Sequence, residues 1–512
     1  MKVASRRVSN YSLALLAIVL IGLFLRLYHL GTQSIWVDEV FSLKMSEFDL
    51  LGLVGRTALY DNSPPLYYIP LHYMILIFGT SEFAIRLLSA LFGVLAIPVI
   101  YLVGRQLFDK EAGLMAALIL AFSSFNVQYS QEARMYTLMV LLALLSMYFF
   151  LRVLRRSTLA TSAGYILTTT LLLYTHYYGL LIVLAQNLYV VILLLLSARD
   201  TFRLRQWVTL EVLVVILFAP WMYVFANRVV LTQVYAWFWI PLPTLNDLIS
   251  TFVVNAGSVF LSILFIALSV IALFRFTRAK GSWDWKSPLK ALAAYSWNVK
   301  VVNVASVLFL VVWLFALNVI PFAMSYVKQP IYYPRYTIAA SVALYVLVAG
   351  GIRNIKWNYA RLVVIGLIVM LSAVSLQSYY VSNGKGDARE ATNLINANAK
   401  SGDIVLFVPS WPQSIFEYYN SRTDVAVKPI GSWAPSDTEE HERLISNVTG
   451  HDRVWLFASP TSQIEKARES FILNVLNESY EQISAKNFDA HHFGASLGPS
   501  NNYHVYLYEK RS

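Results

Sequence analysis

The chain is built from long apolar blocks separated by short polar connections. Several blocks approach ~20 apolar residues, the length at which an α-helix crosses a bilayer. The pattern predicts a polytopic α-helical membrane protein with about eleven transmembrane helices. The expected spans lie near residues 11–30, 84–104, 112–129, 136–154, 161–177, 179–197, 207–226, 248–274, 301–323, 336–352 and 361–379. No small-residue cleavage site follows the first block, so we expect a retained helix rather than a signal peptide.

The pattern changes at about residue 385, where polar and charged residues become common and short helical and strand patterns alternate. Helices are expected over 387–399, 412–420, 437–447 and 460–476, and strands over Ile404–Val408, Val454–Phe457 and His504–Tyr508. This alternation predicts a small soluble α/β domain over residues 385–512. It would follow a transmembrane domain over residues 1–380.

Composition and charge agree with a protein of the cell membrane that crosses it many times. Hydrophobic residues make up 57% of the chain and charged residues 13%, against roughly a quarter charged in soluble domains. Lys and Arg gather in the connections that face the cytoplasm if the N-terminus does, among them Arg152, Arg155, Arg156, Arg203 and Arg205. An odd number of spans then places the C-terminal domain outside the cytoplasm. The net charge of +11 therefore reflects topology and anionic lipid, and it does not indicate nucleic-acid binding.

The chain has no cysteine. This excludes disulfides, thiolate metal sites and cysteine nucleophiles. A domain outside the cytoplasm would therefore depend on its apolar core alone.

The same topology places polar side chains from four separate connections on the outer face. They are Asp38, Glu39, Asp61, Asn62, Glu132, Arg134, His176, Tyr177, Lys328 and Arg335. Each has an ordinary structural interpretation as well. The acids could cap helices or lie in solvated loops, His176 and Tyr177 could anchor at the interface, and Lys328 and Arg335 could bind lipid headgroups. Their joint occurrence on one face favours a functional site.

Transfer of a sugar from a polyprenyl phosphate fits this set of side chains. A carboxylate must deprotonate or orient the acceptor hydroxyl, and Asp38 or Glu39 could do so. Cations must hold the phosphate, for which Arg134, Lys328 and Arg335 are candidates. Acids from two loops, such as Asp38 and Glu132, could also hold Mg²⁺ or Mn²⁺ through oxygen ligands.

Three motifs resemble the GT-C glycosyltransferases. Ile35-Trp36-Val37-Asp38-Glu39 follows the first span, as in the first outer loop of that superfamily. Pro64-Pro65-Leu66-Tyr67-Tyr68 and Ser130-Gln131-Glu132-Ala133-Arg134-Met135-Tyr136 are similar to its bacterial and archaeal branch, which includes protein O-mannosyltransferases and the transferase that adds aminoarabinose to lipid A. The resemblance covers about residues 10–380 in order and topology.

The resemblance implies an inverting transfer from a polyprenyl-phosphate sugar to a glycan, lipid or protein acceptor. It implies a GT-C-like fold, with Asp38 and Glu39 as the catalytic acid pair of the first loop, Asp38 as the preferred base, and Glu132 as the acid of the second loop. One departure concerns the Pro-Pro loop, because Asn62 and Ser63 stand where the aminoarabinose enzyme has an acid and a lysine. Phosphate contacts would then fall to Arg134 or Arg335.

A transporter or flippase of lipid-linked sugars is the main alternative. Transporters place ionisable residues near the bilayer midplane, often in repeated halves. Here the charges lie at the outer ends of the spans, and no internal repeat is evident. A polyprenyl-linked polymerase or a scaffold protein would not need this Asp-Glu pair or four converging polar loops.

Overall fold

The computed structural model describes residues 10–61, 63–196, 204–231, 240–278, 297–327, 329–430, 437–490 and 502–511. They form two compact units. The membrane unit comprises Met1–Tyr28, Phe48–Tyr73 and Leu87–Gln377. The C-terminal unit comprises His29–Glu47, Met74–Arg86 and Ser378–Ser512. The C-terminal unit thus includes two segments that precede residue 385, in addition to the region predicted as a separate domain.

The membrane unit is almost wholly helical, because its apolar blocks can satisfy backbone hydrogen bonds within a bilayer only as helices. Its helices are α1 (Asn10–Leu27), α3 (Leu50–Tyr60), η1 (Pro65–Tyr67), α6 (Lys110–Phe122), α7 (Ser124–Ser130), α8 (Tyr136–Arg155), α9 (Leu159–Leu173), α10 (Gly179–Leu195), α11 (Leu204–Leu231), α12 (Leu245–Ala256), α13 (Val259–Leu273), α15 (Val304–Met324), η2 (Pro334–Thr337), α16 (Ile338–Asn354) and α17 (Asn358–Val381). Helices α4 (Tyr68–Phe78) and α5 (Glu82–Leu107) contribute to both units. A short antiparallel pair, β1 (Phe274–Arg278) and β2 (Trp297–Val301), follows α13.

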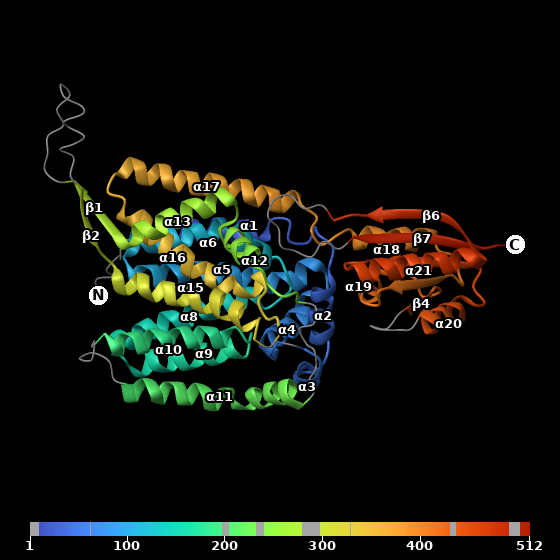
Figure 1. Ribbon diagram of the computed structural model, residues 1–512, viewed down its shortest axis with the longest axis horizontal. Helices are drawn as coiled ribbons and strands as arrows, with labels where there is room; N and C mark the ends of the chain where they lie inside the picture. The colour runs from blue at the N-terminus through green and yellow to red at the C-terminus, as the bar shows by residue number, and fades with distance from the viewer. Residues whose placement is uncertain are drawn as a thin grey trace, which may run out of the picture. The chain divides into compact units, whose positions relative to one another are not determined.

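The helices that could span a membrane match the predicted blocks. Among the described residues, seven helices are long and apolar enough, or up to nine if each of two bent pairs counts as one span. Helices α9 and α10 are apolar but shorter, and the prediction of about eleven spans includes them. The central helix α16 is buried along its whole length and packs against α6, α13 and α15 (Figure 1).

Two of the predicted spans are broken, which the sequence pattern did not indicate. Helices α6 and α7 meet at 60°, and α12 and α13 meet at 87°. The side chain of Ser123 caps the start of α7, and Gly257 ends α12 with a left-handed φ of 101°. The hydroxyl of Tyr345 on α16 lies 2.7 Å from Ser123 Oγ and donates to the Asn255 carbonyl at 2.6 Å. One side chain of the central helix therefore hydrogen-bonds at both breaks.

A five-stranded sheet forms the centre of the C-terminal unit, in the order β4-β3-β5-β7-β6. Strands β3 (Ile404–Val408), β4 (Ala426–Pro429) and β5 (Arg453–Ala458) are parallel, whereas β6 (Tyr480–Phe488) and β7 (Tyr503–Lys510) run antiparallel to their neighbours. The helices are α2 (Val37–Ser46), α18 (Ala388–Asn398), α19 (Pro412–Tyr419), α20 (Asp437–Val448) and α21 (Gln463–Ser479). Strand β3 is buried along its length, as expected for a parallel strand with both faces covered.

Candidate functional site

The Pro-Pro turn joins three parts of the membrane unit. Pro65 opens η1, because its fixed φ suits the first position of a helix and its missing N–H is not needed there. Leu66 donates its N–H to the carbonyl of Tyr174, just beyond the end of α9, at 3.1 Å. The hydroxyl of Tyr67 shares a hydrogen bond of 2.8 Å with Ser89 on α5. The turn therefore has a fixed position between α5 and the connection that follows α9.

Tyr68 links two of the predicted site residues. Its hydroxyl donates to Oδ2 of Asp61 and accepts from Nη1 of Arg134 at 3.2 Å. Ser89 also donates to the backbone carbonyl of Arg134 at 3.1 Å. Asp61, Tyr68 and Arg134 are all buried. Asp61 and Arg134 therefore belong to an interior polar cluster and not to solvated loops.

The connection between α7 and α8 carries Glu132 as well as Arg134. Gln131 donates to the carbonyls of Arg26 and Tyr28, at 3.0 and 2.7 Å, and so ties this connection to the end of α1. Glu132 is only 2% exposed. Glutamate side chains are seldom this deeply buried. Glu132 is therefore not part of a solvated helix end, which was the ordinary interpretation of its sequence position.

Aromatic rings surround Arg335, another buried arginine of the membrane unit. Its guanidinium carbon lies 6.0 Å from the ring centre of Tyr136, 5.0 Å from that of Tyr333 and 5.6 Å from that of Tyr336. Cation–π contacts of this kind hold a guanidinium in place and leave its N–H groups able to bind an anion. Tyr136 begins α8, directly after the connection that carries Arg134.

His176 lies in the same cluster and is neutral. Its ring centre is 5.0 Å from that of Tyr336 and 6.3 Å from that of Tyr136. Nδ1 accepts a hydrogen bond from the N–H of Tyr178 at 3.1 Å, so in this structure Nδ1 carries no proton. Burial and then the charges of Arg134 and Arg335 lower the pKa of His176 to about 3. His176 can therefore donate from Nε2 without adding a third positive charge.

Tyr177 bonds to a further helix of the membrane unit. Its hydroxyl accepts from Nε1 of Trp221 at 3.2 Å, and its ring lies 4.5 Å from that of Phe225. Both partners belong to α11. Lys328 and Asn62, the two remaining candidates of the predicted loops, lie outside the described residues.

Asp38 and Glu39 belong to the C-terminal unit and lie in the first turn of α2. Asp38 is half-buried, whereas Glu39 is fully buried. The guanidinium of Arg86 binds both oxygens of Glu39 at 2.8 Å, and Lys385 Nζ contacts Oε2 at 3.1 Å. Arg86 also donates to three carbonyls of the preceding segment, those of Leu30, Gln33 and Ser34. These contacts give Glu39 a clear structural role in the fold of its unit.

A second ion pair reinforces the same unit. Arg389 on α18 binds the carboxylate of Glu82, and Tyr419 donates to that carboxylate at 2.8 Å. The N–H of Ile35 in turn donates to the Tyr419 hydroxyl at 2.7 Å. The segment that precedes Asp38 is therefore held to α19 by a partly buried hydrogen bond, and Tyr419 connects it to the Glu82–Arg389 pair.

The tyrosines around the two arginines were missed by the sequence analysis as site residues. Tyr68, Tyr136 and Tyr336 contact Arg134 or Arg335, and each is buried. A signal existed, because each tyrosine lies within one or two residues of a predicted motif or site residue.

The predicted metal site receives no added support from the cluster in the membrane unit. No group of three or more His, Asp or Glu side chains arranged for a metal occurs among the residues that the structure describes. Around His176 the charges that depress its pKa are two guanidinium groups, which suit an anion better than a divalent cation. Metal binding by Asp38 and Glu132 stays a prediction, and no catalytic step below depends on it.

Residues 62–224 match a family model described as dolichyl-phosphate-mannose-protein mannosyltransferase. The matched segment contains the Pro-Pro turn, the Glu132–Arg134 connection and His176. No curated protein matches the chain.

Solved structures resemble the chain over nearly its whole length. ArnT from Cupriavidus metallidurans in the apo state is 12% identical with a TM-score of 0.62, and the match covers 98% of each chain. The structure of that protein bound to undecaprenyl phosphate gives 11% identity, a TM-score of 0.62 and the same coverage. The archaeal oligosaccharyltransferase AglB from Archaeoglobus fulgidus, in complex with an inhibitory peptide and a dolichol-phosphate, is 12% identical with a TM-score of 0.54, covering 93% of this chain and 73% of its own. The chain therefore has the fold of the GT-C membrane glycosyltransferases, as the sequence predicted.

Proposed function

We propose that the protein transfers a sugar from a polyprenyl-phosphate donor to a glycan, lipid or protein acceptor, with inversion at the sugar carbon. The observation that carries the proposal is the buried cluster in which Arg134 contacts Tyr68, Arg335 lies among tyrosines, and His176 is neutral. Guanidinium groups bind phosphate oxygens in a bidentate manner. In a buried site of low dielectric constant such contacts are stronger than in water.

The reaction requires that the leaving polyprenyl phosphate be stabilised as an anion. It does not depend on protonation of that phosphate. As the bond between the sugar carbon and the phosphate oxygen breaks, the polyprenyl phosphate gains a negative charge. Arg134 and Arg335 would hold that charge where it develops, which lowers the barrier more than it stabilises the bound donor. His176 Nε2 could add a neutral hydrogen bond to the same oxygens.

Asp38 is our candidate for the general base. It would accept the proton of the acceptor as the acceptor oxygen or nitrogen attacks the sugar carbon from the side opposite the phosphate. Glu39 is less suited, because a carboxylate that is bound by Arg86 and Lys385 is a weak base. This preference for Asp38 over Glu39 agrees with the one that the family resemblance implies.

Several features support this class over the transporter or flippase. Two solved structures of similar fold contain a polyprenyl phosphate, undecaprenyl phosphate in ArnT and dolichol-phosphate in AglB. Asp61, Glu132 and Arg134 lie in connections between helices, and Arg335 lies in η2, directly before α16. We further propose that the C-terminal unit and the site face the outside of the cell membrane, in line with the Lys and Arg distribution.

A transfer assay tests the function directly. Purified protein is given a panel of labelled polyprenyl-phosphate sugars together with glycan, lipid and peptide acceptors, with and without EDTA. We expect one sugar to be transferred with inversion, and its product to identify the acceptor class. Movement of a lipid-linked sugar across vesicles without formation of a product would support the transporter instead.

A further inference from the structure

An arginine lies inside the membrane unit, in the last turn of α1. Arg26 is 0% exposed, although a charged side chain near the end of a membrane helix usually extends to the interface. Its guanidinium donates to the carbonyls of Leu120 at 3.1 Å, Ala121 at 3.3 Å and Gly22 at 3.2 Å. Burying a charge in this way is costly, and the position of these carbonyls indicates what the arginine does.

Two of the carbonyls belong to the break between α6 and α7. Helix α6 ends at Phe122, so Leu120 and Ala121 lie in its last turn, whose carbonyls have no N–H of the same helix to accept from. A positive charge at this end of a helix also compensates the negative end of the helix dipole. Arg26 therefore caps α6 at the point where the chain bends by 60° into α7.

The other end of α7 is held by the same part of α1. Gln131, the residue directly after α7, donates its side-chain amide to the carbonyls of Arg26 and Tyr28 at 3.0 and 2.7 Å. The side chain of Arg26 thus binds the end of α6, and its carbonyl accepts from the end of α7. We call these contacts of Arg26 with α6 and of Gln131 with α1 the Arg26 clamp.

Helix α5 leaves little room for the clamp to shift. A Cβ added at Gly93 would lie 2.3 Å from Oγ of Ser130 and 2.8 Å from Nε of Arg26, so both side chains lie directly against the α5 backbone. Four residues earlier on α5, Ser89 donates to the carbonyl of Arg134 at 3.1 Å. Residues four apart share one face of a helix. The clamp and the backbone of Arg134 therefore rest on the same face of α5.

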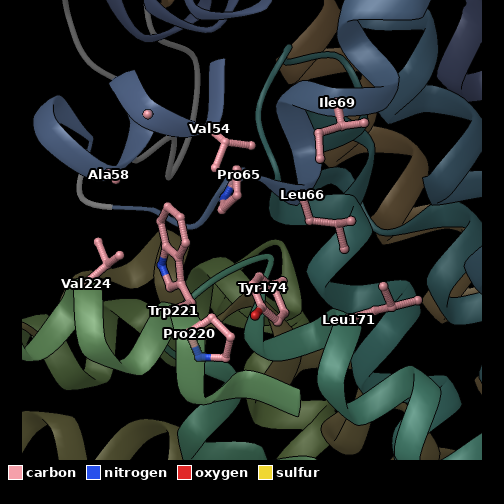
Figure 2. A pocket seen from close by; sticks show the side chains of 11 residues that line it. Val54, Ala58, Pro65, Leu66, Ile69, Leu171, Tyr174, Pro220, Trp221 and Val224 are labelled. Atoms are coloured by element: carbon pink, nitrogen blue, oxygen red, sulfur yellow. The ribbon is translucent and has the colours of Figure 1, made fainter. Parts of the chain in front are cut away.

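The partner of the Arg134 side chain has its own supports. Tyr68, whose hydroxyl accepts from Arg134, directly follows η1. Leu66 of η1 donates its N–H to the carbonyl of Tyr174, and Figure 2 shows Pro65 and Leu66 beside Tyr174 in the lining of an apolar pocket. The η1 turn is therefore fixed from the side of α9. The distance from Arg134 to Tyr68 then depends on where the end of α7 places the connection that carries Arg134.

We propose that Arg26 is a positioning residue for the sugar transfer, because its clamp sets the end of α7 and thereby places Glu132 and Arg134 in the buried cluster. The inference rests on the proposed function, in which Arg134 holds the leaving phosphate. Arg26 acts through Arg134 and not on the substrate itself. A small displacement is enough for a large effect, since a misplacement of ~1 Å can lower a rate on the order of 10²-fold.

Two variants remove opposite halves of the clamp. Arg26→Met keeps an unbranched side chain but has no donor for the α6 carbonyls, and Gln131→Met removes the amide that binds α1. Asn354→Leu is the matched control, because Nδ2 of Asn354 donates to the carbonyls of Ile271 and Ala272 in the last turn of α13, at 2.9 and 3.0 Å. The control removes an equivalent helix cap, at the opposite end of α16 from η2.

We expect Arg26→Met and Gln131→Met to lower the transfer efficiency kcat/KM by about 10- to 100-fold below their unfolding temperature. Asn354→Leu should also unfold at a lower temperature but should keep the transfer efficiency of the unmodified protein. Arg26→Lys, which restores the charge and some of the donors, should regain part of the loss. In a protein that already carries Arg134→Lys, adding Arg26→Met should cost much less than it does alone, because residues that act as a unit have non-additive effects.

Hydrogen exchange provides a measurement that needs no activity. Residues 131–136 form the connection from α7 into α8, and their backbone amides are followed by mass spectrometry in detergent. We expect these amides to exchange about 10-fold faster or more in Arg26→Met and Gln131→Met, because loss of the clamp lowers the free energy of local opening. In Asn354→Leu they should exchange as in the unmodified protein.

The outcomes separate this inference from the proposed function. Unchanged exchange in both clamp variants would overturn the inference, and so would an equal loss of transfer in Asn354→Leu or fully additive losses with Arg134→Lys. If Arg26→Met does not fold, Gln131→Met decides by the same measurements. If the unmodified protein transfers no sugar from any donor, the proposed function fails, and the exchange rates still decide whether the clamp positions the connection.

Discussion

Both carboxylate oxygens of Glu39 accept hydrogen bonds from the guanidinium of Arg86, each at 2.8 Å, within the C-terminal unit. Glu39 is fully buried and Arg86 is 1% exposed. The neighbouring Asp38 is half-buried in the same helical turn. Adjacent residues of a helix point about 100° apart, so the two acids have different surroundings. Glu39 is committed to the fold, and Asp38 is our candidate for the general base.

We expect Glu39→Gln to unfold at a markedly lower temperature than the unmodified protein. Removing one partner of a buried ion pair leaves the other charge uncompensated, which costs about 3–5 kcal/mol. Here Arg86 and Lys385 would both lose their shared partner. Thermal unfolding in detergent measures the effect. A variant with an unchanged transition would show that Glu39 is not a structural anchor, and Glu39 would return as a candidate base.

We expect Asp38→Asn to lose activity but to keep its thermal stability, in contrast to Glu39→Gln. The amide keeps the shape of the side chain but cannot accept a proton, and loss of a general base typically lowers the rate by about 10²–10⁴. The thermal transition should be retained, because Asp38 is not one of the buried charged residues. Asp49→Asn is a suitable control, because Asp49 caps α3 by accepting from the N–H of Gly52 and asparagine is an equally good cap. Wild-type turnover by Asp38→Asn at saturating substrates would exclude Asp38 from catalysis.

The sequence predicted the fold well where a single physical constraint dominates. Bilayer thickness fixes the length of a spanning helix, and each predicted span contains a helix or a bent pair of helices in the structure. The breaks at Ser123 and Gly257 were missed because the apolar run continues through both. Helix α2 was also missed, since a short helix in a loop carries little periodic signal.

In the C-terminal unit, the strands with a strong apolar pattern were predicted and those with a weak pattern were missed. Strands β3, β5 and β7 were predicted, because buried strands are rich in apolar residues. Edge strands β4 and β6 were not. Strand β6 is exposed at seven of its nine residues, and edge strands commonly carry polar residues that discourage pairing with other chains.

The sequence predicted which connections between helices carry the site residues. It did not predict which of those side chains contact one another. Topology indicated that the loops of Asp61, Arg134, His176 and Arg335 share one face. It could not indicate that Tyr68 bridges Asp61 and Arg134. Nor could it indicate that Lys385, far away in the sequence, neutralises Glu39. Such pairings depend on tertiary packing, for which a single sequence carries no local signal.

The low pKa of His176 has a consequence for stability. Its folded pKa is about 3, because of burial and then the charges of Arg134 and Arg335, whereas an unfolded histidine titrates near ~6.5. Below about pH 6.5 the unfolded state therefore binds a proton that the folded state does not, and stability falls as the pH is lowered toward 3. We expect the apparent Tm to drop less between about pH 7.5 and about pH 5 in His176→Gln than in the unmodified protein. Equal drops would mean that His176 has the same pKa in the folded protein as in the unfolded chain.

The orientation of the chain can be tested without an activity assay. The distribution of Lys and Arg predicts that the C-terminal domain lies outside the cytoplasm. A reporter that is active only in the cytoplasm, fused after Ser512, should stay inactive. The same reporter fused in the connection near Arg156 should be active and serves as the positive control. An active reporter at Ser512 would reverse the orientation and place the site on the cytoplasmic face.

Arg335→Lys tests whether the guanidinium group itself, and not only its positive charge, is needed to bind the phosphate. Lysine keeps the positive charge but loses the planar fork that binds two phosphate oxygens and lies against the rings of Tyr333 and Tyr336. A good charge-assisted hydrogen bond contributes about 1.5–3 kcal/mol, so we expect transfer efficiency with the donor to fall by at least about 10-fold. Arg361→Lys is the matched control, because Arg361 forms a partly exposed ion pair with Glu111 away from the cluster. The control should transfer normally, and both variants should keep their thermal transition. If Arg335→Lys transfers sugar as well as the control does, positive charge alone is sufficient at this position, and the guanidinium has no special part in holding the leaving phosphate.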